Sequence, residues 1–310
     1  MINRYTVIGQ PIAHSLSPPI HALFGELTQR RIHYTRTEAT PETFVETVRA
    51  WQASGGRGCN VTVPFKALAL EACDRLSPAA RRARSVNTIH MHPDGSRIGH
   101  TTDGAGLLAD LEGNLRRPLA GRRVLLLGAG GAARAVVEPL LGARPRALHV
   151  ANRTPARATA LADAFAADGA VSGSGTAALA GLEPFDLVIN ATAASLAGEL
   201  PPLPDELLAP DALAYDMMYG PADTVFTAWA RARGHAVADG FGMLVEQAAE
   251  AFAIWESVRP KTRMAWARLE ALRPPGADVD ASPSSASADR RAAEGVPSAA
   301  TGSTSDEELS

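Results

Sequence analysis

The sequence contains only two cysteines, Cys59 and Cys73, in 310 residues. Two are too few for a disulfide framework and they form no C-x-x-C pair, so both are expected to be small apolar side chains in a reducing compartment. No apolar run reaches the roughly 18 residues of a membrane-spanning helix, and the first residues lack the apolar stretch of a signal peptide. The cytoplasm is therefore the expected location.

The chain also has little net charge, because its positive and negative residues nearly cancel to a formal net charge of -3. This balance gives no bulk attraction to nucleic acid or to an anionic membrane, so neither is an expected partner. The eight histidines show no His-x-x-x-His or Cys/His spacing, and no metal site is expected. An anionic small molecule would have to be held by individual lysine and arginine side chains.

Short apolar segments alternate with helical patterns along most of the chain, which predicts an α/β fold. In residues 1–103 the expected strands include 5–8, 34–37, 58–63 and 86–90, and one expected helix covers 67–73. These predict a mixed or mostly parallel sheet. From Arg123 the order is an apolar strand, a glycine turn, a helix and a second strand, which is typical of a Rossmann-like dinucleotide-binding unit.

Composition and these patterns divide the chain into four parts. Residues 1–103 are expected to form a substrate-binding catalytic domain and residues 104–240 a Rossmann domain, with a cleft between them. Residues 241–272 are expected to be C-terminal helices that pack back on the first domain. Residues 273–310 contain no aromatic side chain and much Ala, Ser, Pro and charge, so we expect a disordered tail.

The glycine turn and the end of the following strand indicate a cofactor. The turn consists of Gly128, Ala129, Gly130, Gly131 and Ala132 between a buried strand and a helix, where backbone N–H groups can meet a pyrophosphate. An NAD site usually has an acid at the end of the second strand. Here the side chains are those of Asn152, Arg153, Thr154 and Arg157, which favour the 2′-phosphate of NADP. The alternative is that Thr154 caps a helix and Arg153 is merely solvated.

Polar side chains also gather in the first part of the chain. Ser15 and Ser17 lie two residues apart, Asn60 and Thr62 share one face of a strand, and Lys66 follows that strand. Asn87 and Asp103 come later. Singly, each has a structural explanation as a cap, a strand former or a surface charge. Together they indicate a pocket for a small polyhydroxylated carboxylate.

Eight motifs in this order resemble the shikimate dehydrogenase family, and the resemblance extends from residue 1 to about residue 270. They are Ser15-Leu16-Ser17-Pro18, Gly58-Cys59-Asn60-Val61-Thr62-Val63-Pro64-Phe65-Lys66, Val86-Asn87-Thr88, Thr102-Asp103-Gly104, Gly128-Ala129-Gly130-Gly131-Ala132, Asn152-Arg153-Thr154, Asn190-Ala191-Thr192 and Asp239-Gly240-Phe241-Gly242-Met243-Leu244. The resemblance implies an NADP-dependent enzyme that interconverts 3-dehydroshikimate and shikimate in aromatic amino acid biosynthesis.

The resemblance also implies roles for individual residues. Lys66 and Asp103 would be the catalytic pair, an assignment that suits ketone reduction because an ammonium can deliver the proton that the developing oxyanion needs. Ser15 and Ser17 would bind the substrate carboxylate. The remaining substrate contacts would be Asn60, Thr62, Asn87, Tyr219 and Gln247, and further cofactor contacts would be Thr192, Met217 and Gly240.

Three segments depart from the family pattern: Thr101 stands where Asn is usual, residues 193–196 replace a Ser/Gly-rich turn, and residues 220–224 lack a basic residue. Two alternatives stay open. One is a quinate/shikimate dehydrogenase of broader specificity, and the other is a non-catalytic, cofactor-sensing binding protein on the same scaffold. Either a monomer or a homodimer is expected.

Overall fold

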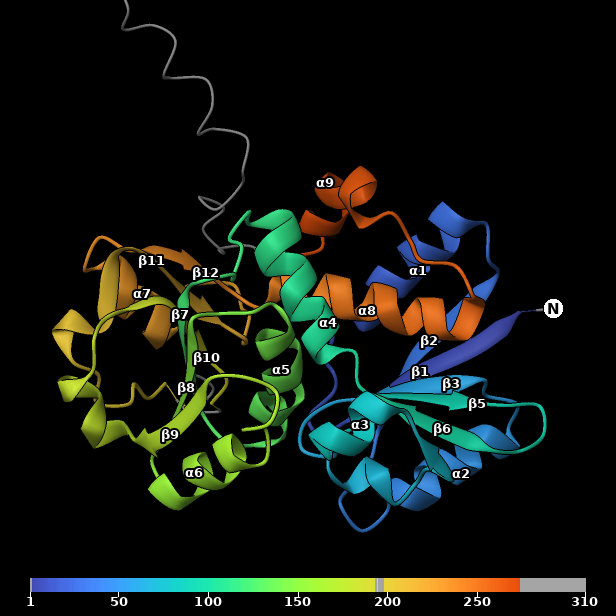
Figure 1. Ribbon diagram of the computed structural model, residues 1–310. Helices are drawn as coiled ribbons and strands as arrows, with labels where there is room; N and C mark the ends of the chain where they lie inside the picture. The colour runs from blue at the N-terminus through green and yellow to red at the C-terminus, as the bar shows by residue number, and fades with distance from the viewer. Residues whose placement is uncertain (1, 193, 195–197, 274–310) are drawn as a thin grey trace, which may run out of the picture.

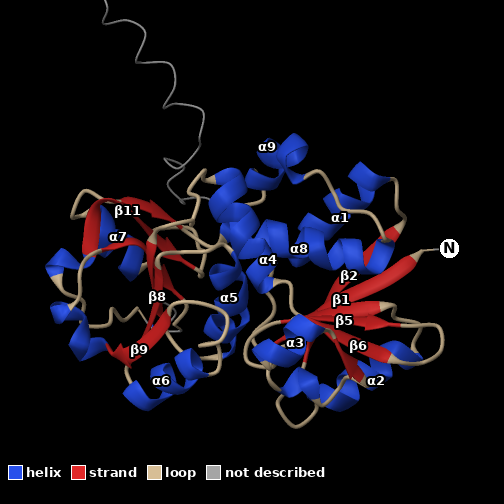
Figure 2. Cartoon of the chain, in the orientation of Figure 1, coloured by secondary structure: helices blue, strands red, loops and turns tan. Residues whose placement is uncertain are grey.

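The computed structural model describes residues 2–192, 194 and 198–273, which form two six-stranded sheets lying side by side (Figure 1). Helices pack on these sheets and between them, as the colouring by secondary structure shows (Figure 2). The tail predicted for residues 273–310 lies outside the described residues except for Arg273. No helix within the described ranges is long and apolar enough to cross a membrane.

The first sheet has the strand order β2-β1-β3-β5-β6-β4. Strands β2, β1 and β3 are mutually parallel, β5 is antiparallel to both β3 and β6, and β4 is parallel to β6. The strands are β1 (Asn3–Gly9), β2 (Ile32–Glu38), β3 (Gly58–Val61), β4 (Arg75–Leu76), β5 (Thr88–Met91) and β6 (Arg97–His100).

Separate helices cover the two faces of this sheet. Phe44 and Val48 of α2 (Phe44–Ala53) pack on one face, together with the 3-10 turn η1 (Leu68–Leu70) and α3 (Pro78–Ala83). The other face meets α1 (Ser17–Thr28) and α8 (Phe241–Glu256), whose apolar side chains form a shared cluster. Helix α8 therefore packs on the first sheet although it follows the second one in the sequence (Figure 1).

The second sheet is parallel throughout, in the order β12-β11-β10-β7-β8-β9. This is the doubly wound Rossmann order, in which ligands bind where the strand order reverses, here between β7 and β10. Its strands are β7 (Arg123–Leu127), β8 (Ala147–Asn152), β9 (Val171–Gly175), β10 (Phe185–Asn190), β11 (Leu208–Asp216) and β12 (Ala236–Ala238). The predicted fold class is confirmed.

The apolar run of β7 is buried on both faces of the second sheet. Val124 and Leu126 join one apolar cluster, and Leu125 and Leu127 join the other, as a covered parallel strand requires. The helices and 3-10 turns of this unit are α5 (Gly131–Gly142), α6 (Pro155–Asp163), η3 (Thr176–Gly181), η5 (Asp205–Leu207) and α7 (Val225–Arg231).

Helix α4 (Asp103–Leu108) connects the two sheets and packs against both α5 and α8. Glycines permit this close packing. A Cβ on Gly104 would lie 2.3 Å from Pro139 Cγ in α5, and one on Gly106 would lie 2.6 Å from Gln247 Cβ in α8. The remaining helical segments are η2, a π-helix (Ala109–Asn114), η6 (Thr262–Ala265) and α9 (Trp266–Glu270).

The helix expected over residues 67–73 is present only in 3-10 form, as η1 with i→i−3 hydrogen bonds that continue to Cys73 N. The helical hydrogen bonds end before Asp74, whose backbone N–H donates to Arg97 O and whose carboxylate accepts from Arg97 N, and the chain continues into β4. No strands were predicted at β4, β9 and β12, which are short or, in β9, rich in serine and glycine.

Candidate active site

Lys66 and Asp103 form an ion pair, with Nζ 2.7 Å from Oδ2. Lys66 follows β3, while Asp103 is the first residue of α4, so two segments 37 residues apart meet at this point. The Asp103 side chain is only 4% exposed and that of Lys66 is 20% exposed. The carboxylate is thus fixed within the protein, whereas the ammonium keeps access to the surroundings.

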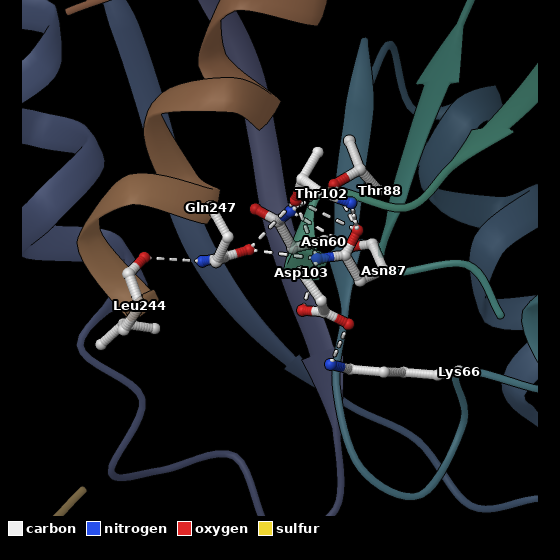
Figure 3. A network of polar contacts seen from close by, with 8 residues as sticks. All are labelled: Asn60, Lys66, Asn87, Thr88, Thr102, Asp103, Leu244 and Gln247. Carbon is white, nitrogen blue, oxygen red and sulfur yellow. Dashed lines mark hydrogen bonds and ion pairs between the residues drawn. The ribbon is translucent and has the colours of Figure 1, made fainter. Parts of the chain in front are cut away.

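Asn87 contacts the second oxygen of Asp103, and Thr102 and Gln247 in turn contact Asn87 (Figure 3). Asn87 Nδ2 donates to Asp103 Oδ1 at 2.9 Å and also lies within hydrogen-bonding distance of Thr102 Oγ1 and Gln247 Oε1. Gln247 is carried by α8, and its own amide donates to Leu244 O. Two of the predicted site residues, Asn87 and Gln247, therefore join Thr102 and the Asp103 carboxylate around one amide group.

Asn60 lies one step further into the first sheet. Its Nδ2 donates to Asn87 O at 3.1 Å and to Thr88 Oγ1 at 3.0 Å, and its Oδ1 accepts from the hydroxyl of Tyr34 at 2.7 Å. Both amide hydrogens of Asn60 are engaged within the protein. Its position therefore suits holding Asn87 better than contacting a substrate directly. Thr62 is partly exposed after the end of β3.

Ser15 lies just before α1, and Ser17 is the first residue of that helix. Ser17 N donates to Ser15 Oγ, and the Arg36 guanidinium donates to Ser15 O at 2.5 and 3.0 Å. Tyr219 comes from beyond β11, yet its phenol interacts with the backbone of Leu16, and burial raises the pKa of that phenol. The two serines and Tyr219 are thus brought together from opposite parts of the chain.

The glycine turn has room for a ligand. Gly128 has a φ of +110° and lies so close to Ala191 O that a Cβ would be 3.1 Å from it. Around Gly130, in contrast, a Cβ would meet no atom within 4 Å. Helix α5 begins at Gly131, so its free N–H groups and positive dipole end point into this open region. The turn fits a pyrophosphate.

The residues after β8 fit a further phosphate. Arg153, Thr154 and Arg157 are exposed, and within the described residues neither arginine makes an ion pair. Thr154 precedes α6, but its hydroxyl makes no capping hydrogen bond, so that structural role is not realised. Asn152 Nδ2 donates to Thr154 O and shapes the turn. Two guanidinium groups and a hydroxyl are therefore available to an anion.

Thr192, Met217 and Gly240 lie around the carboxyl ends of β10 and β11. Asn190 Oδ1 accepts from both N and Oγ1 of Thr192, and Met217 N donates to Asn190 O. Gly240 is needed for close packing, because a Cβ there would lie 2.2 Å from Met217 O. The methyl group of Thr192 faces Gly128, so this group adjoins the glycine turn.

The family departures have different outcomes. The hydroxyl of Thr101 is buried and has no hydrogen-bond partner within the described part of the chain. Of residues 193–196 only Ala194 is described, and its N–H donates to Thr192 Oγ1. In residues 220–224, Thr224 caps α7 and Asp223 pairs with Arg231.

A paired lysine and aspartate beside a doubly wound dinucleotide-binding sheet define a two-domain oxidoreductase. Comparisons with known proteins specify which one. Residues 7–89 match the model of the shikimate dehydrogenase substrate binding domain, and residues 111–197 match that of shikimate / quinate 5-dehydrogenase. The chain belongs to the shikimate dehydrogenase family, as the sequence motifs indicated.

Individual relatives are similar to this chain along most of their length. The shikimate dehydrogenase (NADP(+)) of Aeromonas hydrophila is 53% identical over 270 residues, covering 87% of this chain and 98% of the relative. A solved Ael1 enzyme from Pseudomonas putida is 46% identical, with a TM-score of 0.81 over 88% of this chain and 99% of that one. The shikimate 5-dehydrogenase of Thermus thermophilus, solved with NADP(H) and shikimate, is 34% identical, with a TM-score of 0.76 over 87% and 99%.

Four residues of the site were not assigned as site residues from the sequence: Tyr34, Thr88, Thr102 and Asp216. Thr88 and Thr102 adjoin assigned residues, so their motifs held a local signal. Tyr34 and Asp216 had none, because they act through buried contacts with residues distant in the sequence. Asp216, which is fully buried, accepts hydrogen bonds from Asn190 Nδ2 and Met218 N and so shapes the loop that holds Met217.

Proposed function

We propose that this chain is an NADP-dependent oxidoreductase that interconverts 3-dehydroshikimate and shikimate, a step of aromatic amino acid biosynthesis. The relatives named shikimate dehydrogenase (NADP(+)) share about half of its residues over nearly their whole length. The observation that carries the proposal is the Lys66–Asp103 ion pair, which stands among amide and hydroxyl groups suited to a polyhydroxylated ring.

The substrate would lie against the first sheet. Ser15 and Ser17 would hold its carboxylate, with Tyr219 closing over them from the second unit. Asn87, Gln247 and Thr62 would contact the ring hydroxyls, while Asn60 would support Asn87. These groups are neutral donors and acceptors, which select hydroxyl positions because an unmatched buried polar group is costly.

The residues present fit NADP. Gly128, Ala129, Gly130, Gly131 and Ala132 would cradle the pyrophosphate at the start of α5, and Asn152, Arg153, Thr154 and Arg157 would hold the 2′-phosphate. Thr192, Met217 and Gly240 would border the nicotinamide. When bound, the cofactor supplies or accepts the hydride.

Proton transfer would belong to the chain itself. Lys66 would donate a proton to the ketone oxygen in the direction of reduction and remove it from the hydroxyl in the reverse direction. Asp103 would hold the ammonium in place through Oδ2 and accept a hydrogen bond from an adjacent substrate hydroxyl. Asn87 already fixes Oδ1 of the same carboxylate, which restricts its rotation.

We infer that substrate and cofactor are bound by different parts of the chain. Residues 1–103 together with residues 241–272 would bind substrate, and residues 104–240 would bind the cofactor, with the reaction in a cleft between them. The packing of α8 on α1 supports the assignment of the C-terminal helices. A monomer or homodimer in the cytoplasm remains our expectation, and sedimentation equilibrium of the full chain would decide the oligomeric state.

The direct test follows NADPH formation with shikimate, repeated with quinate and with NAD. We expect turnover of shikimate with NADP, and much lower kcat/KM when either partner is replaced. Similar kcat/KM for quinate would favour the broader quinate/shikimate enzyme. Binding of NADP without turnover of either acid would favour the cofactor-sensing protein and contradict the proposed function.

A further inference from the structure

A continuous series of buried hydrogen bonds connects Tyr34 with Asp103. The Tyr34 hydroxyl donates to Asn60 Oδ1 at 2.7 Å, and Asn60 Nδ2 donates to Thr88 Oγ1 at 3.0 Å. Thr88 Oγ1 then donates to Asn87 Oδ1 at 3.1 Å, and Asn87 Nδ2 donates to Asp103 Oδ1 at 2.9 Å. Figure 3 shows this series from Asn60 onward.

The backbone determines the direction of each bond. Thr102 N–H can only donate, and it points at Asn87 Oδ1 at 2.8 Å, so the NH2 group of Asn87 must face Asp103. Asn87 O can only accept, and it receives a hydrogen bond from Asn60 Nδ2, so Asn60 Oδ1 must face Tyr34. The phenol is therefore required as a donor at the far end of the series.

The surroundings hold Tyr34 in this orientation. Its ring stacks on His21 with centroids 4.3 Å apart and planes 9° apart, and His21 is fully buried. Thr88 is likewise fully buried, and Asn60 is 6% exposed. Water therefore cannot readily replace a missing partner, and each amide depends on its neighbours for its orientation.

We propose that Tyr34, Asn60 and Thr88 are positioning residues that set the amide orientation of Asn87 and thereby the placement of the Asp103 carboxylate. None of the three needs to touch the reacting atoms. They define which face of Asn87 presents a donor to Asp103 and to the substrate. This inference rests on the proposed function, because its effect is measured on shikimate turnover.

The first test is Tyr34→Phe, which removes the donor and keeps the stacked ring. Asn60 Oδ1 then loses the phenol donor, and Asn60 keeps its interaction with His21. We expect kcat/KM for shikimate to fall about tenfold, while the Kd for NADP is unchanged. The Tyr34 hydroxyl also interacts with Ser17, so a second variant that leaves this contact intact is needed to assign the loss to Asn87. The matched control is Tyr5→Phe. Tyr5 is also a buried, stacked tyrosine in the same sheet, but its hydroxyl donates to Glu256 at 2.6 Å, outside this series.

The second test is Thr88→Val, which preserves shape and removes the hydroxyl between the two amides. We expect a similar loss in kcat/KM for shikimate. Thr6→Val is the control, because Thr6 is fully buried in β1 and its hydroxyl bonds to Thr35 O and Thr37 Oγ1. Melting temperatures of each variant and its control would be compared, so that loss of stability is separated from loss of positioning.

The double variant Tyr34→Phe/Thr88→Val gives the decisive result. If both residues act through Asn87, the double variant should be little worse than either single variant, whereas independent defects would multiply. Multiplying losses, or single variants equal to their controls, would overturn the inference while wild-type turnover still supports the proposed function. A wild-type protein that does not turn over shikimate would instead overturn both.

Discussion

The substrate-binding and cofactor-binding halves of this protein build their sites in different ways. In the first half, the groups around Asp103 are buried side chains from β3, β5, α4 and α8 that hydrogen-bond to one another. In the second half, the groups proposed to bind phosphate are the backbone at the start of α5 and the exposed side chains of Arg153 and Arg157. One site depends on mutual orientation, and the other on local backbone and charge.

This difference has a physical reason. A cofactor phosphate is a strong anion that helix N–H groups and guanidinium groups attract from many orientations. Ring hydroxyls are neutral, and they can be distinguished only by donors and acceptors whose directions are already fixed. We therefore expect substitutions in the first half to affect catalysis and substrate selection, and those in the second half to affect cofactor affinity.

The largest effect is expected for Lys66→Ala. Loss of the proton donor should lower kcat about 100- to 10,000-fold, with a much smaller change in the KM for shikimate. Steady-state kinetics in both directions would measure it. Lys261→Ala is the control. Lys261 is the only other lysine of the chain, it is exposed, and it is distant from Lys66 in the sequence. A kcat near that of wild type would remove Lys66 from the mechanism.

A smaller effect, confined to the cofactor half, is expected for Arg153→Gln. The variant loses a charged hydrogen-bond donor to the 2′-phosphate, so the KM for NADP should rise about 10- to 100-fold. The KM for NAD, which lacks this phosphate, should stay constant and serves as the internal control. Equal changes for both cofactors would show that Arg153 does not read the 2′-phosphate.

Gly130→Ala should weaken both cofactors alike. The added methyl group would enter the open region beside Gly130 without touching the protein, so stability should be unchanged. Because the pyrophosphate is common to NADP and NAD, both KM values should rise about tenfold, the loss of roughly one hydrogen bond. The neighbouring Gly131 also has room for a methyl group, because an added Cβ would lie 3.8 Å from its nearest neighbour, Ser85 Oγ. A KM change for one cofactor alone would contradict this placement.

The last expected effect is on stability in acid and not on activity, and it should arise in the substrate half. Burial lowers the pKa of His21 from 6.5 to about 3. Below pH 6.5 His21 is protonated in the unfolded chain but stays neutral in the folded chain. The free energy of unfolding should therefore fall as the pH falls, by up to about 1.4 kcal/mol per pH unit. Burial also lowers the pKa of His90, to about 4, which acts in the same direction.

Urea unfolding of His21→Phe between pH 4 and 7 would test this. Phenylalanine keeps an aromatic ring beside Tyr34 and removes the titrating group, so the slope should flatten. His33→Phe, at an exposed position of β2, is the control and should keep the wild-type slope. An unchanged slope in His21→Phe would assign the acid sensitivity to other groups.

Sequence patterns predicted the elements whose signals are local. The run Val124–Leu127, the glycine turn and the start of α5 were found because a buried parallel strand and a phosphate-binding turn require particular residues at consecutive positions. The helix expected at residues 67–73 forms only as the 3-10 helix η1, and it is followed by hydrogen bonds between Asp74 and Arg97 that helix propensity does not register. Tyr34 was missed because nothing near it in the sequence marks its partner Asn60.

The sequence by itself determined the α/β class, the dinucleotide-binding turn, the family, and the identity of the Lys66 and Asp103 pair. Those features depend on residue type at short spacing or in ordered motifs. Only the tertiary structure decided that Asn60 supports Asn87, that α8 brings Gln247 to Asp103, and which way each amide faces. The reason is that hydrogen-bond direction depends on partners that folding brings together from distant parts of the chain, from Tyr34 in one strand to Gln247 in the last long helix.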